Sequence, residues 1–292
     1  MFANACTSVR GFMRPVIIST QFFDKTVECS CGVFIVINDE GWVITVAHLF
    51  ETDAISQQHL KEVSNYKSAL QAIQQNVKLN TKQKNKHVKN LKINKKWITN
   101  CSYWWGSNNV KLDNVRLIAE GDLAIGQLKP FDQSSVKAYP IFKNLSNLDI
   151  GTSLCKLGYP FHKIEATFDE TNNSFELAPN TFPLPLFPIE GIYTRNLILG
   201  KSKDEKYVIK FLETSSPGLR GQSGGPIFDA KGTVWAVQSR TSCFPMGFSP
   251  IIERNGRKTE ENQFLNVGLG VHPELIVAFL NDNKIKFNLS EY

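Results

Sequence analysis

Short apolar runs separated by turn residues recur along most of the chain, and they constrain its fold more than any other feature. The runs are rich in Val, Ile, Leu and Phe, which suit a pleated, partly buried strand. Clusters of Gly, Asn, Asp and Pro separate them, as at residues 38–41, and such clusters mark turns. The clearest runs cover residues 32–37, 42–50, 115–118, 123–128, 153–159, 206–212, 226–229, 233–239 and 264–271. Many short strands of this kind indicate antiparallel β-barrels or a sandwich.

Two segments show helical spacing instead. Within residues 60–77 the apolar positions lie three or four apart, which indicates one apolar face of a helix. Within residues 273–283, Pro273 suits a first helical position and Glu274 suits the first turn. The apolar stripe of this closing helix would be Leu275, Ile276, Phe279 and Leu280.

Composition and charge exclude several classes of protein. Of the 292 residues, 42% are hydrophobic and 21% are charged, as in folded globular chains and unlike disordered or collagen-like ones. No window reaches the ~18–20 apolar residues of a membrane span, so no membrane partner is expected. Arg10 and Arg14 interrupt what would have to be an apolar signal core, which favours a cytoplasmic location over secretion.

The six cysteines form neither a metal motif nor a disulfide framework. Cys29 and Cys31 lie two apart in a strand-like run, on one face, where a bridge between them would be strained. The others are scattered, and no Cys-x-x-Cys pair is present. We therefore expect buried free thiols, no metal and no organic cofactor.

Three strings carry residues suited to acyl transfer. In Gly221-Gln222-Ser223-Gly224-Gly225-Pro226, a serine in a tight glycine turn can present its hydroxyl and two backbone N–H groups on one side. A serine is a weak nucleophile without a base, and His48 ends a strand-like run that could supply one. Asp122 leads into an apolar strand, where its carboxylate could lie buried beside an imidazole.

These strings, in the order His48, Asp122, Ser223, resemble the motifs of the trypsin-like serine peptidases. The likeness is greatest to the bacterial HtrA-like branch, on the strings CGVFIVINDEGWVITVAHLF, DIGTSLCKLGYPF and NVGLGVHPELIVAFL. The resemblance implies an all-β fold: two six-stranded antiparallel β-barrels with a C-terminal helix and a helical insertion in the first barrel. The implied bounds are 12–135 for the N-terminal barrel with its insertion at about 55–98, 136–271 for the C-terminal barrel and 272–284 for the helix.

The resemblance also implies a role for each residue of the strings. Ser223 would be the nucleophile, His48 the general base and then the general acid, and Asp122 the carboxylate that orients the imidazole. The N–H groups of Gly221 and Ser223 would bind the oxyanion. Asp113 is a rival for the carboxylate, although it lacks the D-x-A-I context of Asp122.

Substrate-binding positions follow from the same resemblance. Pro217 stands six residues before the nucleophile, where relatives that select Lys or Arg have an acidic residue, so that preference is not expected. Ser239, Arg240 and Thr241 should form one pocket wall and pair with the substrate backbone. Gly268 should belong to the far wall. Arg240 has two interpretations. It favours an acidic residue in the substrate, or it is solvated or forms an ion pair within the protein.

A basic segment separates His48 from Asp122. Residues 60–98 hold ten lysines and one acid, so they carry +9, whereas the whole chain carries +6. The segment is either a solvated decoration, which we favour, or a docking arm for a protein or nucleic acid. Lysines without interleaved arginines or aromatics are weak indicators of nucleic-acid binding, so a protein partner is the better of the two.

The sequence as a whole therefore predicts a serine endopeptidase acting on a protein or peptide substrate. From the likeness to the HtrA-like branch, limited processing of a specific target is favoured over bulk digestion. The alternative is a catalytically weak module of the same fold that binds or senses a partner through its basic insertion.

Overall fold

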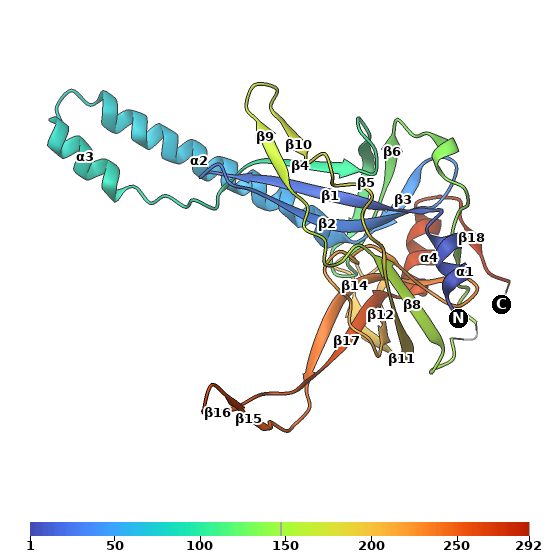
Figure 1. Cartoon of the computed structure of the whole chain (residues 1–292). Helices are drawn as coiled ribbons and strands as arrows, with labels where there is room; N and C mark the ends of the chain where they lie inside the picture. The colour runs from blue at the N-terminus through green and yellow to red at the C-terminus, as the bar shows by residue number, and fades with distance from the viewer. Residues whose placement is uncertain (147, 292) are drawn as a thin grey trace.

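Two antiparallel β-sheets make up most of the computed structural model, which describes residues 1–146 and 148–291 (Figure 1). The helices are α1 (Ala3–Val9), α2 (Glu51–Gln75), α3 (Thr81–Asn90) and α4 (Pro273–Asp282), with short 3₁₀ turns η1 (Ala47–Phe50) and η2 (Gln133–Ser135). The expectation of a mostly β fold with few helices is confirmed.

The first sheet is antiparallel and curled, with the strand order β4-β1-β2-β3-β6-β5. Its strands are β1 (Met13–Phe22), β2 (Val27–Val36), β3 (Trp42–Thr45), β4 (Ile98–Trp105), β5 (Lys111–Ile118) and β6 (Leu123–Lys129). Within the described residues no ladder joins the edge strands β4 and β5, so the six strands of this half form a curled half-barrel.

The second sheet closes on itself. Strands β13 (Pro226–Phe228), β8 (Ser153–Gly158), β11 (Phe187–Lys201), β12 (Val208–Thr214), β17 (Phe264–Val271) and β14 (Val234–Pro245) follow one another, and β13 also pairs with β14. This ring has the six antiparallel strands expected of the second barrel. Two short strands, β7 (Ile141–Phe142) and β18 (Asn288–Leu289), extend it by parallel pairing, which the sequence did not predict.

Apolar side chains from both sheets form the core. Phe34, Ile44, Phe211 and Phe228 are among the largest side chains that are fully buried. Each such side chain contributes about 1.5–3 kcal/mol through removal from water. Helix α4 closes the core with its apolar stripe, and His272 caps it by accepting the Glu274 backbone N–H at Nδ1 over 3.2 Å.

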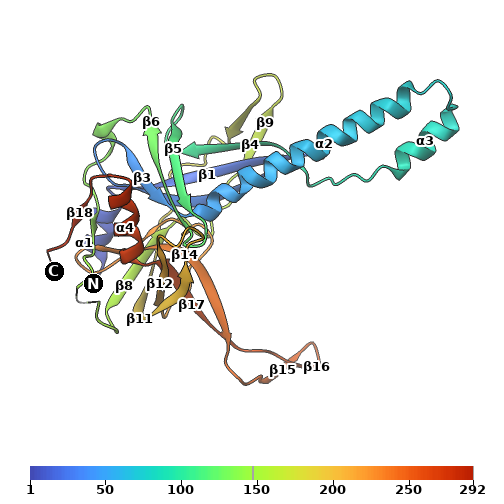
Figure 2. The same ribbon diagram turned by 180° about the vertical axis from the view of Figure 1, so that it is seen from behind.

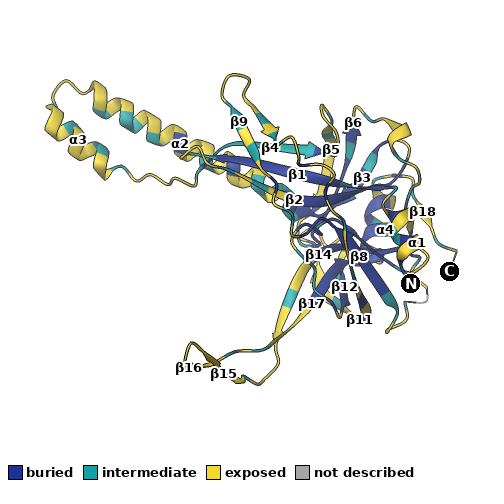
Figure 3. Cartoon of the chain, in the orientation of Figure 1, coloured by how far each residue is buried: buried dark blue, intermediate teal, exposed yellow. Residues whose placement is uncertain are grey.

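The insertion is a pair of helices, and α2 begins at Glu51 rather than near Leu60. The helix continues directly from η1, and its early acidic residues suit the positive end of the helix dipole. Its proximal part packs on the first sheet, where the Tyr66 ring lies 5.7 Å from Phe23 and 6.1 Å from Trp97. The distal part of α2 and all of α3 extend away from the body and are largely exposed (Figure 3).

Two hairpins project from the body as well. One consists of β9 (Ala166–Asp169) and β10 (Ser174–Leu177), and the other of β15 (Ile251–Arg254) and β16 (Arg257–Glu260) at the tip of the long β14–β17 pair (Figure 2). None of the helices described is both long and apolar enough for a membrane crossing. Of the thiols expected to be buried only Cys155 is so, while four are partly buried: Cys6, Cys29, Cys31 and Cys101. Cys243 lies exposed on β14, because that strand leaves the barrel there.

Candidate active site

His48 and Asp122 lie beside each other because β3 pairs with β6. His48 is in η1, directly after β3, and Asp122 immediately precedes β6. His48 Nδ1 lies 2.9 Å from Asp122 Oδ2, and the His48 backbone N–H donates to Oδ1 over 2.9 Å. Asp122 has a φ of +49°, a left-handed conformation that aspartate tolerates better than most residues. The pair is therefore fixed through both the backbone and the side chain of the histidine.

The Asp122 carboxylate is buried and fully engaged. Its side chain is 7% exposed, and the Ser239 hydroxyl from β14 donates to Oδ2. Burial by itself would raise the pKa of Asp122, but hydrogen bonds and charge from His48, together with the Ser239 hydrogen bond, outweigh it and lower that pKa. The group is thus an anion at neutral pH, suited to holding the imidazole in one tautomer.

Ser223 lies in a turn that is held by both sheets. Val33 of β2 donates its backbone N–H to the Ser223 carbonyl over 2.8 Å, and Gly224 donates to Gln238 of β14 over 2.8 Å. Gly224 has a φ of +83°, and a side chain there would collide with the Val33 carbonyl and the Thr45 hydroxyl. Only glycine allows the turn to fit so closely against the first sheet.

Two backbone N–H groups of this turn remain available. Within the described residues, neither the Gly221 nor the Ser223 amide donates to a protein acceptor. Gly221 has a φ of +93°, and a Cβ there would lie 2.5 Å from the Tyr159 carbonyl oxygen. Gln222, whose role the sequence did not reveal, braces the turn: its Oε1 accepts the Leu219 N–H over 3.0 Å. Two free donors on a rigid turn can receive developing negative charge.

His48 and Ser223 face one cavity of about 660 Å³. Within the described residues no hydrogen bond joins His48 Nε2 to the Ser223 hydroxyl, and the hydrogen bonds of the imidazole go to Asp122 through Nδ1. The cavity also includes Cys31, Leu49, Thr52, Tyr159, Phe161, His162, Lys163, Arg220 and Gly221.

An aromatic group supports the histidine turn. The rings of Phe50, Tyr103 and Trp105 stack with their centroids 6.0 Å apart, and the Tyr103 hydroxyl donates to the Leu49 carbonyl over 2.9 Å. The sequence offered a weak signal for this support, an aromatic run at the end of a strand, but not its contact with the turn. The support fixes the residue that follows His48.

Three of the five predicted substrate-binding positions, Pro217, Thr241 and Gly268, meet at the segment that precedes Ser223. Thr241 Oγ1 donates to the Gly218 carbonyl over 2.6 Å, and Gly268 pairs with Thr241 across β14 and β17. The Pro217 carbonyl accepts a hydrogen bond from the buried Lys156 ammonium over 3.1 Å. Arg240 is exposed, with its guanidinium 4.9 Å from the Phe211 ring centroid. The Ser239 hydroxyl donates to Asp122 Oδ2. Asp113 is 51% exposed and lies 3.9 Å from Lys129, away from His48.

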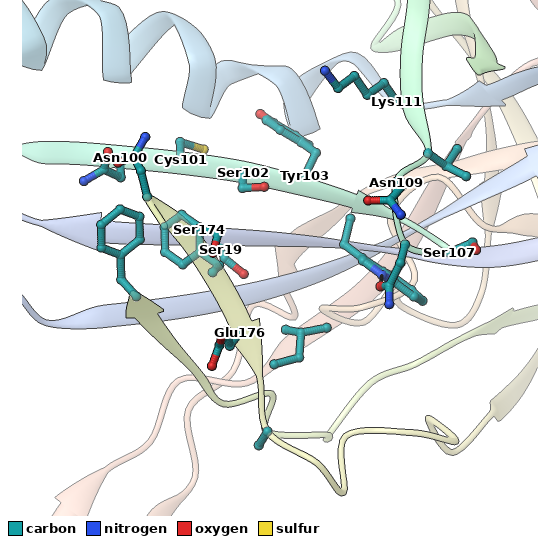
Figure 4. Close-up of a pocket in the computed structure, with 18 of the residues that line it drawn as sticks. Ser19, Asn100, Cys101, Ser102, Tyr103, Ser107, Asn109, Lys111, Ser174 and Glu176 are labelled. Atoms are coloured by element: carbon teal, nitrogen blue, oxygen red, sulfur yellow. Dashed lines mark hydrogen bonds between the residues drawn. The ribbon is translucent and has the colours of Figure 1, made fainter. Parts of the chain in front are cut away.

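A larger cavity, of about 960 Å³, lies elsewhere, between β4 and the β9–β10 hairpin (Figure 4). Its labelled polar residues include Ser19, Asn100, Ser102 and Glu176. Its lining residues include none of His48, Asp122 and Ser223, and no histidine is among them.

Comparison with known proteins identifies the family of the chain. The sequence profile of the trypsin-like peptidase domain matches residues 31–237, and the chain therefore belongs to that family of peptidases. No curated protein matches the chain in sequence. Among solved structures, it is similar to the active form of the Rv3671c protease from M. tuberculosis, with a TM-score of 0.48, 13% identity, and coverage of 98% of this chain and 86% of that one. It is also similar to the HtrA-type protease AlgW with a tripeptide, with a TM-score of 0.44, 12% identity, and coverage of 97% of this chain and 63% of that one.

Proposed function

We propose that the protein is a serine endopeptidase that uses Ser223, His48 and Asp122. The observation that carries the proposal is the shared cavity in which Ser223 meets a histidine already oriented by a buried carboxylate. The free N–H groups of Gly221 and Ser223 support the same assignment, because acyl transfer needs an oxyanion site next to the nucleophile.

The chemistry follows from these positions. Ser223 Oγ attacks the scissile carbonyl carbon while His48 Nε2 takes the hydroxyl proton, and the carbonyl oxygen becomes an oxyanion. When the C–N bond breaks, His48 gives the proton to the departing amine and leaves an acyl-enzyme on Ser223. Water, deprotonated by His48, then releases the acid and restores the serine. Asp122 stays ionised and stabilises the imidazolium throughout.

Strand β14 offers an edge for the substrate backbone. It pairs with β13 only up to Val237, whereas its pairing with β17 continues to Pro245. The backbone of Gln238 still bonds Gly224 and Gly225, and beyond Gln238 that side of β14 has no neighbouring strand within the described residues. An extended peptide can add a strand there, which would bring its carbonyl to Ser223.

Limited processing of a specific target is the favoured task. The helical insertion and the β15–β16 hairpin extend from the same side of the molecule in both views (Figures 1 and 2). Thr52, in the first turn of α2, lines the cavity that holds Ser223, so a folded substrate that reaches the cavity comes close to the start of the insertion. Such an approach selects an exposed segment of a matching protein over the bulk of unrelated chains.

Cleavage of a peptide library by the full chain tests the proposal. We expect cleavage products from the wild type and a loss of about 10⁴–10⁶-fold in rate for Ser223→Ala. Ser64→Ala, a change on the exposed face of α2, serves as the matched control and should leave the rate unchanged. Equal products from Ser223→Ala and wild type would overturn the assignment, and no cleavage by either would favour a binding module of the same fold.

A further inference from the structure

A buried lysine lies next to the predicted substrate-binding positions and has no role in the chemistry described above. Lys156 is on β8 and is 1% exposed. Its ammonium donates to the Ser216 carbonyl, to the Ser216 hydroxyl over 3.0 Å and to the Pro217 carbonyl over 3.1 Å. A side chain at Gly268 would collide with the same Nζ. The positions expected in the two pocket walls, Pro217 and Gly268, therefore meet at this ammonium.

The ammonium lacks a counter-charge. Within the described residues, no carboxylate lies within 4.0 Å of Lys156 Nζ, and its three acceptors belong to neutral groups. Burial lowers the pKa of Lys156 to about 7, the effect of an environment that does not compensate a positive charge. Of the three acceptors, only the Ser216 hydroxyl belongs to a side chain, and a rotation would free its place for another oxygen.

The position of Lys156 relative to Ser223 indicates which part of a substrate would meet it. Ser216 and Pro217 lie seven and six residues before the nucleophile, in the segment that leads to the oxyanion turn. Thr241 ties β14 to that segment through the Gly218 carbonyl. A peptide paired with β14, with its scissile carbonyl at Ser223, directs the side chain of the residue before the scissile bond (P1) between these two walls.

The charges around the cavity point the same way. Arg220 and Lys163 line the cavity that holds His48 and Ser223, and no aspartate or glutamate lines it. Arg220 is exposed and makes no ion pair within the described part of the chain. Lys163 is already paired with Glu165 over 2.5 Å, so the unpaired charge at the cavity is that of Arg220, which favours an acidic segment in the substrate.

We propose that Lys156 makes the enzyme selective for substrates with an acidic P1 side chain, glutamate or aspartate, whose carboxylate replaces the Ser216 hydroxyl at the ammonium. This inference rests on the peptidase function proposed above. A carboxylate at this position completes a charge-assisted hydrogen bond in a site from which water is excluded. A neutral isostere such as glutamine leaves the ammonium with neutral partners only.

Fluorogenic peptides that differ only at P1 test the selectivity with the full chain. We expect the wild type to cleave after Glu with a kcat/KM about 10–100-fold above that for Gln, the range of a charge-assisted hydrogen bond. Lys156→Met should bring the ratio close to one. Lys143→Met is the matched control, because Lys143 is also buried but bonds the Ser146 carbonyl far from the cavity, and it should keep the wild-type ratio.

Labelling by a fluorophosphonate, run in parallel, separates the two proposals. Labelled wild type that cleaves after Gln or Leu as fast as after Glu overturns the acidic selectivity and leaves the peptidase standing. A Lys156→Met variant that is labelled and still prefers Glu at P1 also overturns the acidic selectivity. Wild type that is neither labelled nor active on any peptide contradicts the peptidase function itself, and the selectivity with it.

Discussion

Asp122 is the residue on which the geometry of the site depends most. It accepts from the backbone and the ring of His48 and from Ser239, so one carboxylate links the first sheet to β14. Because all three donors favour the anion, the carboxylate keeps its charge in spite of burial. The charge fixes the orientation of the imidazole and, in the proposed mechanism, compensates the imidazolium.

Replacing this carboxylate by an amide tests that dependence. Asp122→Asn should lower kcat by about 10⁴-fold with little change in KM, because the amide favours the wrong tautomer of His48 while the fold remains. Asp113→Asn is the control for the rival carboxylate, and kinetics on the best peptide substrate are the measurement. A loss for Asp113→Asn and none for Asp122→Asn would reverse the assignment.

Lys156 carries a pH-dependent effect on stability that does not depend on any substrate. Its pKa is about 7 in the folded chain and near 10.5 when exposed, so between these values the unfolded chain binds more protons. The free energy of unfolding therefore rises with pH across that window. We expect Lys156→Met to raise Tm at pH 7 by about 2–4 °C or more, and the gain to shrink near pH 9.5. A variant less stable than wild type at pH 7, measured by thermal unfolding, would contradict this.

The sequence predicted the residues of the site better than their supports. His48, Asp122 and Ser223 stand in local strings whose chemistry is readable one string at a time. The contact of Ser239 with Asp122 spans 117 residues and depends on how β14 crosses the site, which no local pattern shows. Lys156 stands in a strand-like run of the sequence, where a lysine usually points to solvent. In the structure both faces of β8 are buried, and the lysine is buried with them.

At the level of elements, the turn between β12 and β13 joins the two halves of the site. It contacts Val33 of β2 on one side and Gln238 of β14 on the other. Gly224→Ala should strain the turn, because the left-handed φ and the nearby Val33 carbonyl leave no room for a Cβ. We expect loss of fluorophosphonate labelling and a lower Tm. Gly232→Ala, at another left-handed glycine where the nearest atom is 3.9 Å away, controls for backbone strain alone. Retained labelling in Gly224→Ala would show that the turn is adaptable.

Element boundaries followed the sequence where burial sets the pattern and departed from it elsewhere. Helix α4 matches its apolar stripe because that stripe packs on the core. Helix α2 begins earlier than its apolar spacing suggests, since a turn already formed at His48 nucleates it. The open edge between β4 and β5 was not predictable, because pairing between distant strands leaves no local signature.

For the whole molecule, the basic insertion divides into a packed part and a free part. Tyr66 and Val63 bind α2 to the first sheet, whereas α3 has no buried residue. Replacing residues 71–93 by a Gly-Ser linker should therefore leave Tm unchanged. The peptide kcat/KM should stay within about twofold of the wild-type value. Removing residues 60–96 instead takes away the packing as well and should lower Tm. A large loss of peptide cleavage in the shorter deletion would assign the distal arm to the active site.

The central claim is that Ser223 is a nucleophile activated by His48, and the site of a fluorophosphonate adduct tests it most directly. Intact-mass analysis of the full chain, followed by peptide mapping, should show one adduct, on Ser223. The adduct should be lost in Ser223→Ala and formed far more slowly in His48→Ala. An adduct on another serine, or no adduct on the folded wild-type chain, would contradict the claim.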